Sequence, residues 1–258
     1  MENLTRLRVE IADHIAVVTM DIPPVNAQDR QFHEEMMLVF DRFSEMSEVR
    51  VAILTGAGKN FSAGADVKAR AAVEWAPGER WQHARRAREC FNAICECKKP
   101  VIAAINGPAL GAGLALAASC DILVAADSAS LGLPEIGLGR IGGAKHAMRL
   151  FGHSLARRMV LTGHRVAGAE LYRLGVVEAC VPQGELMAKA GEIAREIAAK
   201  SPLGIRLAKQ ALNTIEELSL RDGFRFEQEM TTLLTGSAES EEAVRAFLEK
   251  RAPVFKDR

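Results

Sequence analysis

The first half of the chain alternates strand-like and helix-like patterns of apolar residues. Residues 7–10 and 15–21 are β-rich runs separated by a short turn, which predicts a β-hairpin. Residues 30–47 carry apolar side chains at helical spacing, and the apolar run at 51–55 ends before a glycine, which indicates a helix followed by a buried strand. Further helices are predicted at 81–97 and 111–119, and further strands at 101–105 and 122–126. Strands that alternate with helices in this way indicate an α/β core.

The pattern changes at Gly143, after which helical spacing dominates to the C-terminus. One apolar helix face is formed by Leu203, Leu207, Ala208, Ala211, Leu212 and Ile215. We therefore expect an α/β core over residues 1–190 and a helical region over 191–258. Residues 73–80 contain a Pro-Gly pair and little periodicity, so a mobile loop is expected there.

The composition narrows the class of protein. Basic and acidic residues both number 33 in 258 residues, so no net charge draws the chain toward nucleic acid or an anionic membrane. No segment reaches the roughly 20 apolar residues that a membrane span needs, and the N-terminus lacks a signal-peptide pattern. Cytoplasm is therefore the expected compartment. Five cysteines, an odd number, argue against a disulfide framework, and Cys95 and Cys97 lack the spacing of a metal site.

Two glycine-rich segments have the same design. Residues 61–66 and 106–112 each follow a predicted strand and lead into a predicted helix. The first N–H groups of a helix have no intrahelical partner and carry partial positive charge. Two such groups aimed at one point form an oxyanion hole. Close packing of strand and helix explains either turn equally well when it is considered alone.

Several short motifs occur together in this chain. They are Pro24-Val25-Asn26-Ala27, the 61–66 segment, residues 103–107, residues 119–122, Pro134-Glu135, and residues 247–251. In this combination the chain resembles the crotonase family, also called the enoyl-CoA hydratase/isomerase family, over nearly its whole length. The resemblance implies an α/β fold, a crotonase-like spiral of ββα units with a helical C-terminal trimerisation region. It also implies a homotrimer or a hexamer.

The resemblance implies a catalytic role for three positions. Backbone N–H groups of Ala65 and Ala112 would hold the thioester oxygen of an acyl-CoA substrate, and Glu135 would act as the acid/base. Glycine is usual at position 112, so a positive φ there would strain the alanine. Ala115 stands where related hydratases carry a first glutamate, and its methyl group cannot activate water.

A single acid/base favours Δ3-to-Δ2 enoyl-CoA isomerisation, with a proton removed from C2 and returned at C4. The alternatives are a true 2-enoyl-CoA hydratase that uses Glu135 with another group, and a decarboxylase or C–C hydrolase that acts on a carboxylated acyl-CoA. A different class, a non-catalytic or RNA-binding relative, would use Arg85, Arg86 and Arg88, although neutral net charge disfavours nucleic acid.

The remaining candidate residues concern the substrate. The resemblance implies CoA contacts for Asn26, Ala27, Asp66, Lys68, Phe247 and Lys250, the last two often from a neighbouring subunit. Asp66 alternatively caps a helix. Arg140, Lys145 and His146 depart from the family pattern beside the expected acyl pocket. His146 is a candidate second catalytic group, and Arg140 a candidate ligand for a second carboxylate; the alternative is that all three face solvent or a subunit contact. No metal or redox cofactor is implied, and CoA arrives as part of the substrate.

Overall fold

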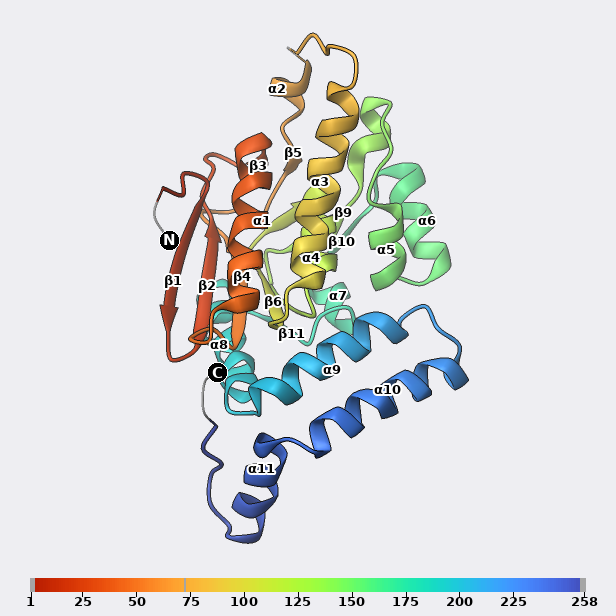
Figure 1. Ribbon diagram of the computed structural model, residues 1–258. Helices are drawn as coiled ribbons and strands as arrows, with labels where there is room; N and C mark the ends of the chain where they lie inside the picture. Colours follow the sequence, from red (N-terminus) through yellow and green to blue (C-terminus); the bar gives the residue numbers. More distant parts are fainter. Residues whose placement is uncertain (1–2, 72, 256–258) are drawn as a thin grey trace.

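The computed structural model describes residues 3–71 and 73–255. Its centre is a six-stranded sheet in the order β1-β2-β4-β6-β8-β11 (Figure 1). The strands are β1 (Leu7–Ala12), β2 (Ile15–Met20), β4 (Val51–Gly56), β6 (Val101–Ile105), β8 (Ile122–Ala126) and β11 (Ala179–Val181). β1 and β2 form the predicted antiparallel hairpin, whereas the other neighbouring pairs are parallel. Because parallel neighbours need long crossover connections, helices cover the sheet.

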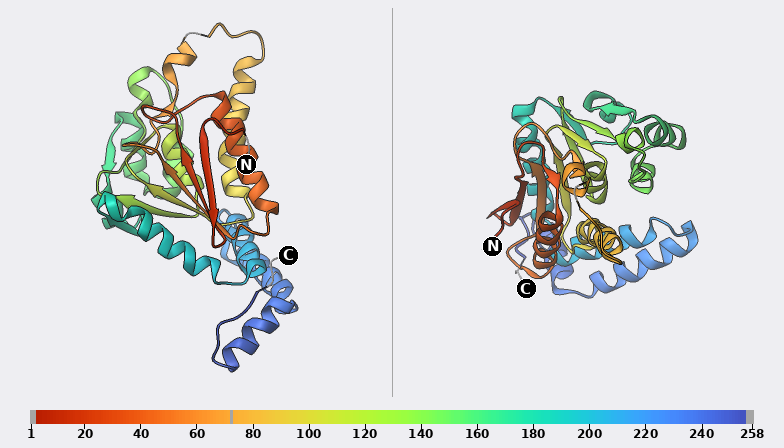
Figure 2. Two further views of the ribbon diagram at one scale, coloured as in Figure 1. Left: turned by 90° about the vertical axis from the view of Figure 1, so that its left-hand side faces the viewer. Right: turned by 90° about the horizontal axis from the view of Figure 1, so that it is seen from above.

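Helices enclose this sheet on both faces. α1 (Arg30–Glu45), α3 (Glu79–Glu96) and α4 (Ala112–Ser119) share one core with the sheet, and α8 (Leu186–Ala198) forms a second core on the other face (Figure 2). Along β4, Ala52 and Leu54 belong to the first core, whereas Val51 and Ile53 pack with α8. Both faces of the strand are therefore apolar, which explains why its sequence is a continuous apolar run.

Two small sheets hold the turns that follow the central strands. β10 (Arg165–Ala167), β9 (Ser130–Gly132) and β7 (Pro108–Leu110) form one, and β3 (Ala27–Gln28) pairs with β5 (Gly64–Ala65) in the other. β10 and β11 lie in the region where the sequence indicated mainly helix. At three residues each, they are too short to show a period of two.

The remaining core elements are short. They are α2 (Val67–Ala71), the 3-10 helix η1 (Pro134–Leu138), α5 (Ala144–Leu150), α6 (His153–Thr162), α7 (Gly168–Arg173) and the 3-10 helix η2 (Gln183–Glu185). Residues 73–76, within the segment expected to be a loop, form neither helix nor strand.

Three helices extend away from the core at the C-terminal end (Figure 1). They are α9 (Pro202–Ile215), α10 (Leu220–Thr235) and α11 (Ala238–Leu248). α8 spans the expected boundary near residue 190 and packs on the sheet, so the extension begins with α9. Within the described residues, no helix combines the length and apolar character that crossing a membrane requires.

A buried lysine fixes α9 to the core. Lys209 lies on the packed side of α9, although the expected apolar face did not include it. Its Nζ donates hydrogen bonds to the carbonyl oxygens of Ile94 and Lys99, at 3.1 and 3.0 Å, and pairs with Asp121 at 2.8 Å. The same Asp121 oxygen accepts the N–H of Val101 at the start of β6, at 2.7 Å. Asp121 therefore joins α9 to the start of β6.

We expect Lys209→Met to lower the free energy of unfolding by about 3 kcal/mol, because a buried ion pair that loses one partner leaves the other charge uncompensated. Urea unfolding followed by circular dichroism, at fixed protein concentration, measures the change. The control is Lys200→Met at an exposed lysine beyond α8. Equal stabilities for the two variants would contradict the anchoring role.

Candidate functional site

Two glycine-rich turns follow β4 and β6 in the chain and pack directly against each other, backbone to backbone. A Cβ atom on Gly107 would lie 2.0 Å from the carbonyl oxygen of Lys59, and one on Gly113 would lie 2.2 Å from that of Ser62. The amide of Leu110 donates to the same Ser62 oxygen at 2.9 Å. No side chain fits between segments this close, so glycine is required where they cross.

Two buried asparagines hold the first of these turns. Asn26 donates its side-chain amide to the carbonyl oxygens of Ala57, Asn60 and Phe61, at 3.0, 2.8 and 3.2 Å. Asn106 donates to Gly58 and Asn60 and accepts the N–H of Gly56. The side chain of Asn26, predicted to contact CoA, is therefore engaged in shaping the turn.

The crossing places the two predicted oxyanion-hole residues next to each other. An ideal Cβ on Gly64, the neighbour of Ala65, would lie 3.1 Å from the backbone nitrogen of Ala112. Ala112 is the first residue of α4, so its N–H has no acceptor within the helix. The positive φ of this turn, 57°, falls on Gly111 and not on Ala112. Alanine at position 112 therefore carries no strain from a left-handed backbone.

Glu135 lies in η1 and faces the start of α4. Its Oε1 would lie 2.5 Å from a Cβ on Gly111, so the glycine makes room for the carboxyl group. Oε2 is buried and accepts no hydrogen bond from the described residues. Burial raises the pKa of Glu135, an effect partly offset by its own backbone N–H. A carboxyl with a raised pKa is suited to taking up and returning a proton near neutral pH.

One cavity of about 1020 Å³ joins these groups. Ala65, Ala112, Ala115, Glu135, Arg140 and His146 all line it. Glu135 is the only carboxylate among the described lining residues. Ala115 contributes a methyl group to the lining, so the cavity brings together the carboxyl group of Glu135 and the two residues whose backbone amides were predicted to form an oxyanion hole.

The residues of α3 that line this cavity were not predicted from the sequence. Arg80, His83, Ala87 and Phe91 recur on α3 at helical spacing and form a stripe about three turns long. This spacing is the signal in the sequence that identifies them. His146 packs edge-on against Phe91, with ring centroids 5.4 Å apart. Burial, and then the charge of Arg149, lower the pKa of His146, so its imidazole is neutral at pH 7.

Several predicted residues lie outside this cavity. Asp66 accepts the N–H of Ala69 at 2.9 Å and so caps α2, the structural alternative named for it. Lys145 pairs with Glu217 at 2.6 Å and is exposed. The other predicted residues that do not line the cavity are Ala27 in β3, the exposed Lys68, and Phe247 and Lys250 at the end of the chain. Their CoA contacts remain predictions.

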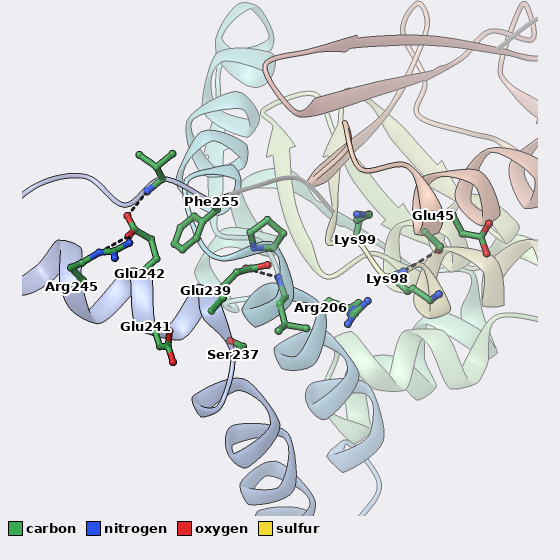
Figure 3. A pocket seen from close by; sticks show the side chains of 15 residues that line it. Glu45, Lys98, Lys99, Arg206, Ser237, Glu239, Glu241, Glu242, Arg245 and Phe255 are labelled. Atoms are coloured by element: carbon green, nitrogen blue, oxygen red, sulfur yellow. Dashed lines mark hydrogen bonds and ion pairs between the residues drawn. The ribbon is translucent and has the colours of Figure 1, made fainter.

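A second cavity, of about 660 Å³, lies where α9 and α11 meet the core (Figure 3). Its lining is charged, but two of its carboxylates are used within the fold. Glu239 accepts the N–H of Leu203 at 3.0 Å, and Glu242 pairs with Arg245 and accepts the N–H of Val254. We interpret this cavity as a structural junction and not as the catalytic site.

The arginines of the RNA-binding alternative do not form one exposed patch. Arg85 and Arg88 are exposed on α3, whereas Arg86 is half-buried. Glu89 follows them directly in the sequence. The geometry gives this alternative no added support.

Comparison with known proteins shows which family the chain is similar to. A family model described as enoyl-CoA hydratase/isomerase matches residues 10–258. The carnitinyl-CoA dehydratase of Escherichia coli K12 is 39% identical over 254 residues, covering 95% of each protein. A probable mitochondrial enoyl-CoA hydratase of Dictyostelium discoideum is 36% identical, covering 93% of this chain and 87% of that protein. The crystal structure of an enoyl-CoA hydratase from Bacillus anthracis superposes with a TM-score of 0.93 at 35% identity, covering 98% of this chain and 100% of that one.

The fold and the site therefore define an acyl-CoA enzyme with the crotonase fold. The chain belongs to the enoyl-CoA hydratase/isomerase family.

We expect Gly113→Ala to lower the free energy of unfolding by about 2 kcal/mol, because its methyl group would force the two turns apart. Thermal unfolding monitored by circular dichroism measures the loss. The matched control is Gly184→Ala in η2, where an added Cβ meets nothing within 4 Å. A Gly113→Ala variant as stable as this control would show that the crossing tolerates a side chain.

We expect Glu135→Gln to stabilise the fold in a pH-dependent way. Burial raises the pKa of this carboxyl above its ordinary value of 4.5, so the folded state disfavours the ionised form. The cost of ionisation begins as pH rises through 4.5 and is complete above the folded-state pKa. The unfolding midpoint of the variant should therefore exceed that of the wild type most at neutral pH, and the gap should shrink below pH 4.5. A gap independent of pH would contradict this origin.

Proposed function

We propose that this enzyme moves a proton through a thioester enolate and converts 3-enoyl-CoA to 2-enoyl-CoA with Glu135 as its single acid/base. The observation that carries the proposal is the lone carboxylate of the cavity, with one oxygen buried and free of hydrogen bonds. Because burial raises its pKa, Glu135 is a stronger base than an exposed carboxylate and can also return the proton.

In this proposal the two backbone amides stabilise the negative charge on the thioester oxygen, which the carboxylate cannot do. In the proposed reaction Glu135 takes a proton from C2, and the electron pair delocalises onto the thioester oxygen. The N–H groups of Ala65 and Ala112 hold that oxygen as its charge develops, and each such donor contributes about 3 kcal/mol to transition-state stabilisation. Glu135 then delivers the proton to C4 as the double bond shifts. Ala115 offers no group to position water.

Hydration of a 2-enoyl-CoA is the second candidate, and the position of His146 favours it. His146 lines the same cavity as Glu135 and has a lowered pKa, so a neutral imidazole is available as a second base. Relatives described as an enoyl-CoA hydratase and a carnitinyl-CoA dehydratase are consistent with chemistry that adds or removes water. In this candidate reaction His146 would activate water, and Glu135 would transfer the proton at C2.

We further propose that the working enzyme is a trimer or a pair of trimers in the cytoplasm, with CoA bound as part of the substrate. Phe247 is 80% exposed, lies on α11 and does not line the cavity of its own chain. Phe224 on α10 and Leu248 on α11 are also largely exposed, at 56% and 73%. Association through these helices would bury them and bring Phe247 and Lys250 to a neighbour's CoA.

An acyl-CoA panel tests the reaction. We expect turnover of 3-hexenoyl-CoA to exceed hydration of crotonyl-CoA, and Glu135→Gln to slow exchange of the substrate α-proton in D₂O by about 10²–10⁴-fold. Ala115→Glu should shift the product ratio toward hydration. Exchange that persists undiminished in Glu135→Gln would remove Glu135 from the mechanism.

His146→Asn separates the two candidate reactions. Isomerisation by Glu135 alone leaves turnover of 3-hexenoyl-CoA unchanged in this variant, whereas the hydration candidate requires loss of activity on crotonyl-CoA. Fast hydration by the wild type that depends on His146 would replace the isomerase proposal with the second candidate.

A further inference from the structure

Two arginines, both exposed, are among the residues that line the cavity. Arg80 begins the cavity-facing stripe of α3, and Arg140 follows η1 on the wall that carries Glu135. The backbone N–H of Arg140 donates to the carbonyl oxygen of Glu135 at 3.1 Å. The guanidinium of Arg140 is thus within one side-chain length of the residue that carries the acid/base.

Neither arginine is neutralised by the protein. Within residues 3–71 and 73–255, no carboxylate forms an ion pair with Arg80 or Arg140. The single carboxylate of the cavity, Glu135, shows a pKa set by burial and not by a neighbouring cation. The cavity therefore combines two guanidinium groups with one carboxyl group whose pKa is raised by burial.

The rest of the wall also differs from a hydrocarbon pocket. His83 packs against Trp75, with centroids 5.5 Å apart, and His146 packs against Phe91. A guanidinium group gains no hydrogen bond from a plain alkyl chain. An anionic group would satisfy it, and a guanidinium matches the two oxygens of a carboxylate in a bidentate pair.

From this arrangement we propose that the substrate is an acyl-CoA whose acyl group carries a second carboxylate, bound by Arg140 with a contribution from Arg80. This inference rests on the proposed function in placing the acyl group beside Glu135. CoA phosphates are a second possible source of the anion. The acyl carboxylate is favoured because the pantetheine arm separates those phosphates from the thioester by far more than one arginine side chain.

Binding of saturated thioesters, which have no double bond to shift or hydrate, tests this assignment independently of turnover. The probes are glutaryl-CoA, its terminal amide glutaramoyl-CoA, and free CoA, titrated calorimetrically into the full-length enzyme. We expect the wild type to bind glutaryl-CoA about 10- to 100-fold more tightly than the amide. In Arg140→Met this preference should fall to less than about threefold, with the affinity for the amide and for free CoA unchanged. Arg80→Met should reduce the preference partially.

The control is Arg157→Met, at an exposed arginine of α6 that does not line the cavity, which should retain the full preference. Thermal unfolding checks that each variant is folded. Equal wild-type affinity for glutaryl-CoA and its amide overturns the proposal. A loss of affinity for free CoA in Arg140→Met also overturns it, because the arginine would then be a phosphate contact.

The two proposals fail in different ways. If Glu135→Gln leaves α-proton exchange of glutaryl-CoA intact, the proposed proton transfer is wrong, whereas the preference for the carboxylate still stands. If exchange is lost in that variant but glutaryl-CoA and its amide bind the wild type equally, the proposed carboxylate recognition is wrong, whereas the proposed proton transfer still stands.

Discussion

The site depends on the direct contact between two backbone turns. Each turn leaves a buried parallel strand, and they cross where Gly107 and Gly113 come within contact distance of the carbonyl oxygens of Lys59 and Ser62. Asn26 and Asn106 hold the first turn with side-chain hydrogen bonds to its backbone groups. The amide of Ala112 is set beside Gly64 only because nothing larger than hydrogen separates the chains.

The environment of the acid/base follows from this crossing. α4 starts at the turn and is buried from Gly113 onward, which explains why its side chains are small or apolar. Gly111 leaves the space that the carboxyl group of Glu135 occupies. The helix α4 thus has the N–H of Ala112, which lacks an intrahelical acceptor, at its first residue and room for the carboxyl group of Glu135 at Gly111, and burial raises the pKa of that carboxyl group.

The C-terminal helices are connected to the same site through an arginine. Arg149 on α5 donates to the carbonyl oxygen of Ala118 at the end of α4, at 2.8 Å, and pairs with Glu216 beyond α9, at 2.9 Å. His146 lies one turn earlier on α5 and forms part of the cavity wall. α5 therefore contacts both the segment after α9 and the cavity, whereas Lys209 fixes the middle of α9 to Asp121 at the start of β8.

The sequence by itself determined the core strands, the longer helices, the two glycine turns and the place of Glu135 among them. Apolar runs, helical spacing and glycine are local signals, and the motifs needed no knowledge of distant contacts. β10 and β11 were not predicted, since strands of three residues depend on their partners for definition. The cavity-facing stripe of α3 has a readable spacing, but an amphipathic spacing does not say whether its polar residues face solvent or a cavity. The cap at Asp66 is local, since its partner Ala69 lies three residues further on, and it was one of the two roles named for Asp66 from the sequence. The engagement of the Asn26 amide and the burial of Lys209 were decided by tertiary structure, because each depends on partners that lie far away in the sequence.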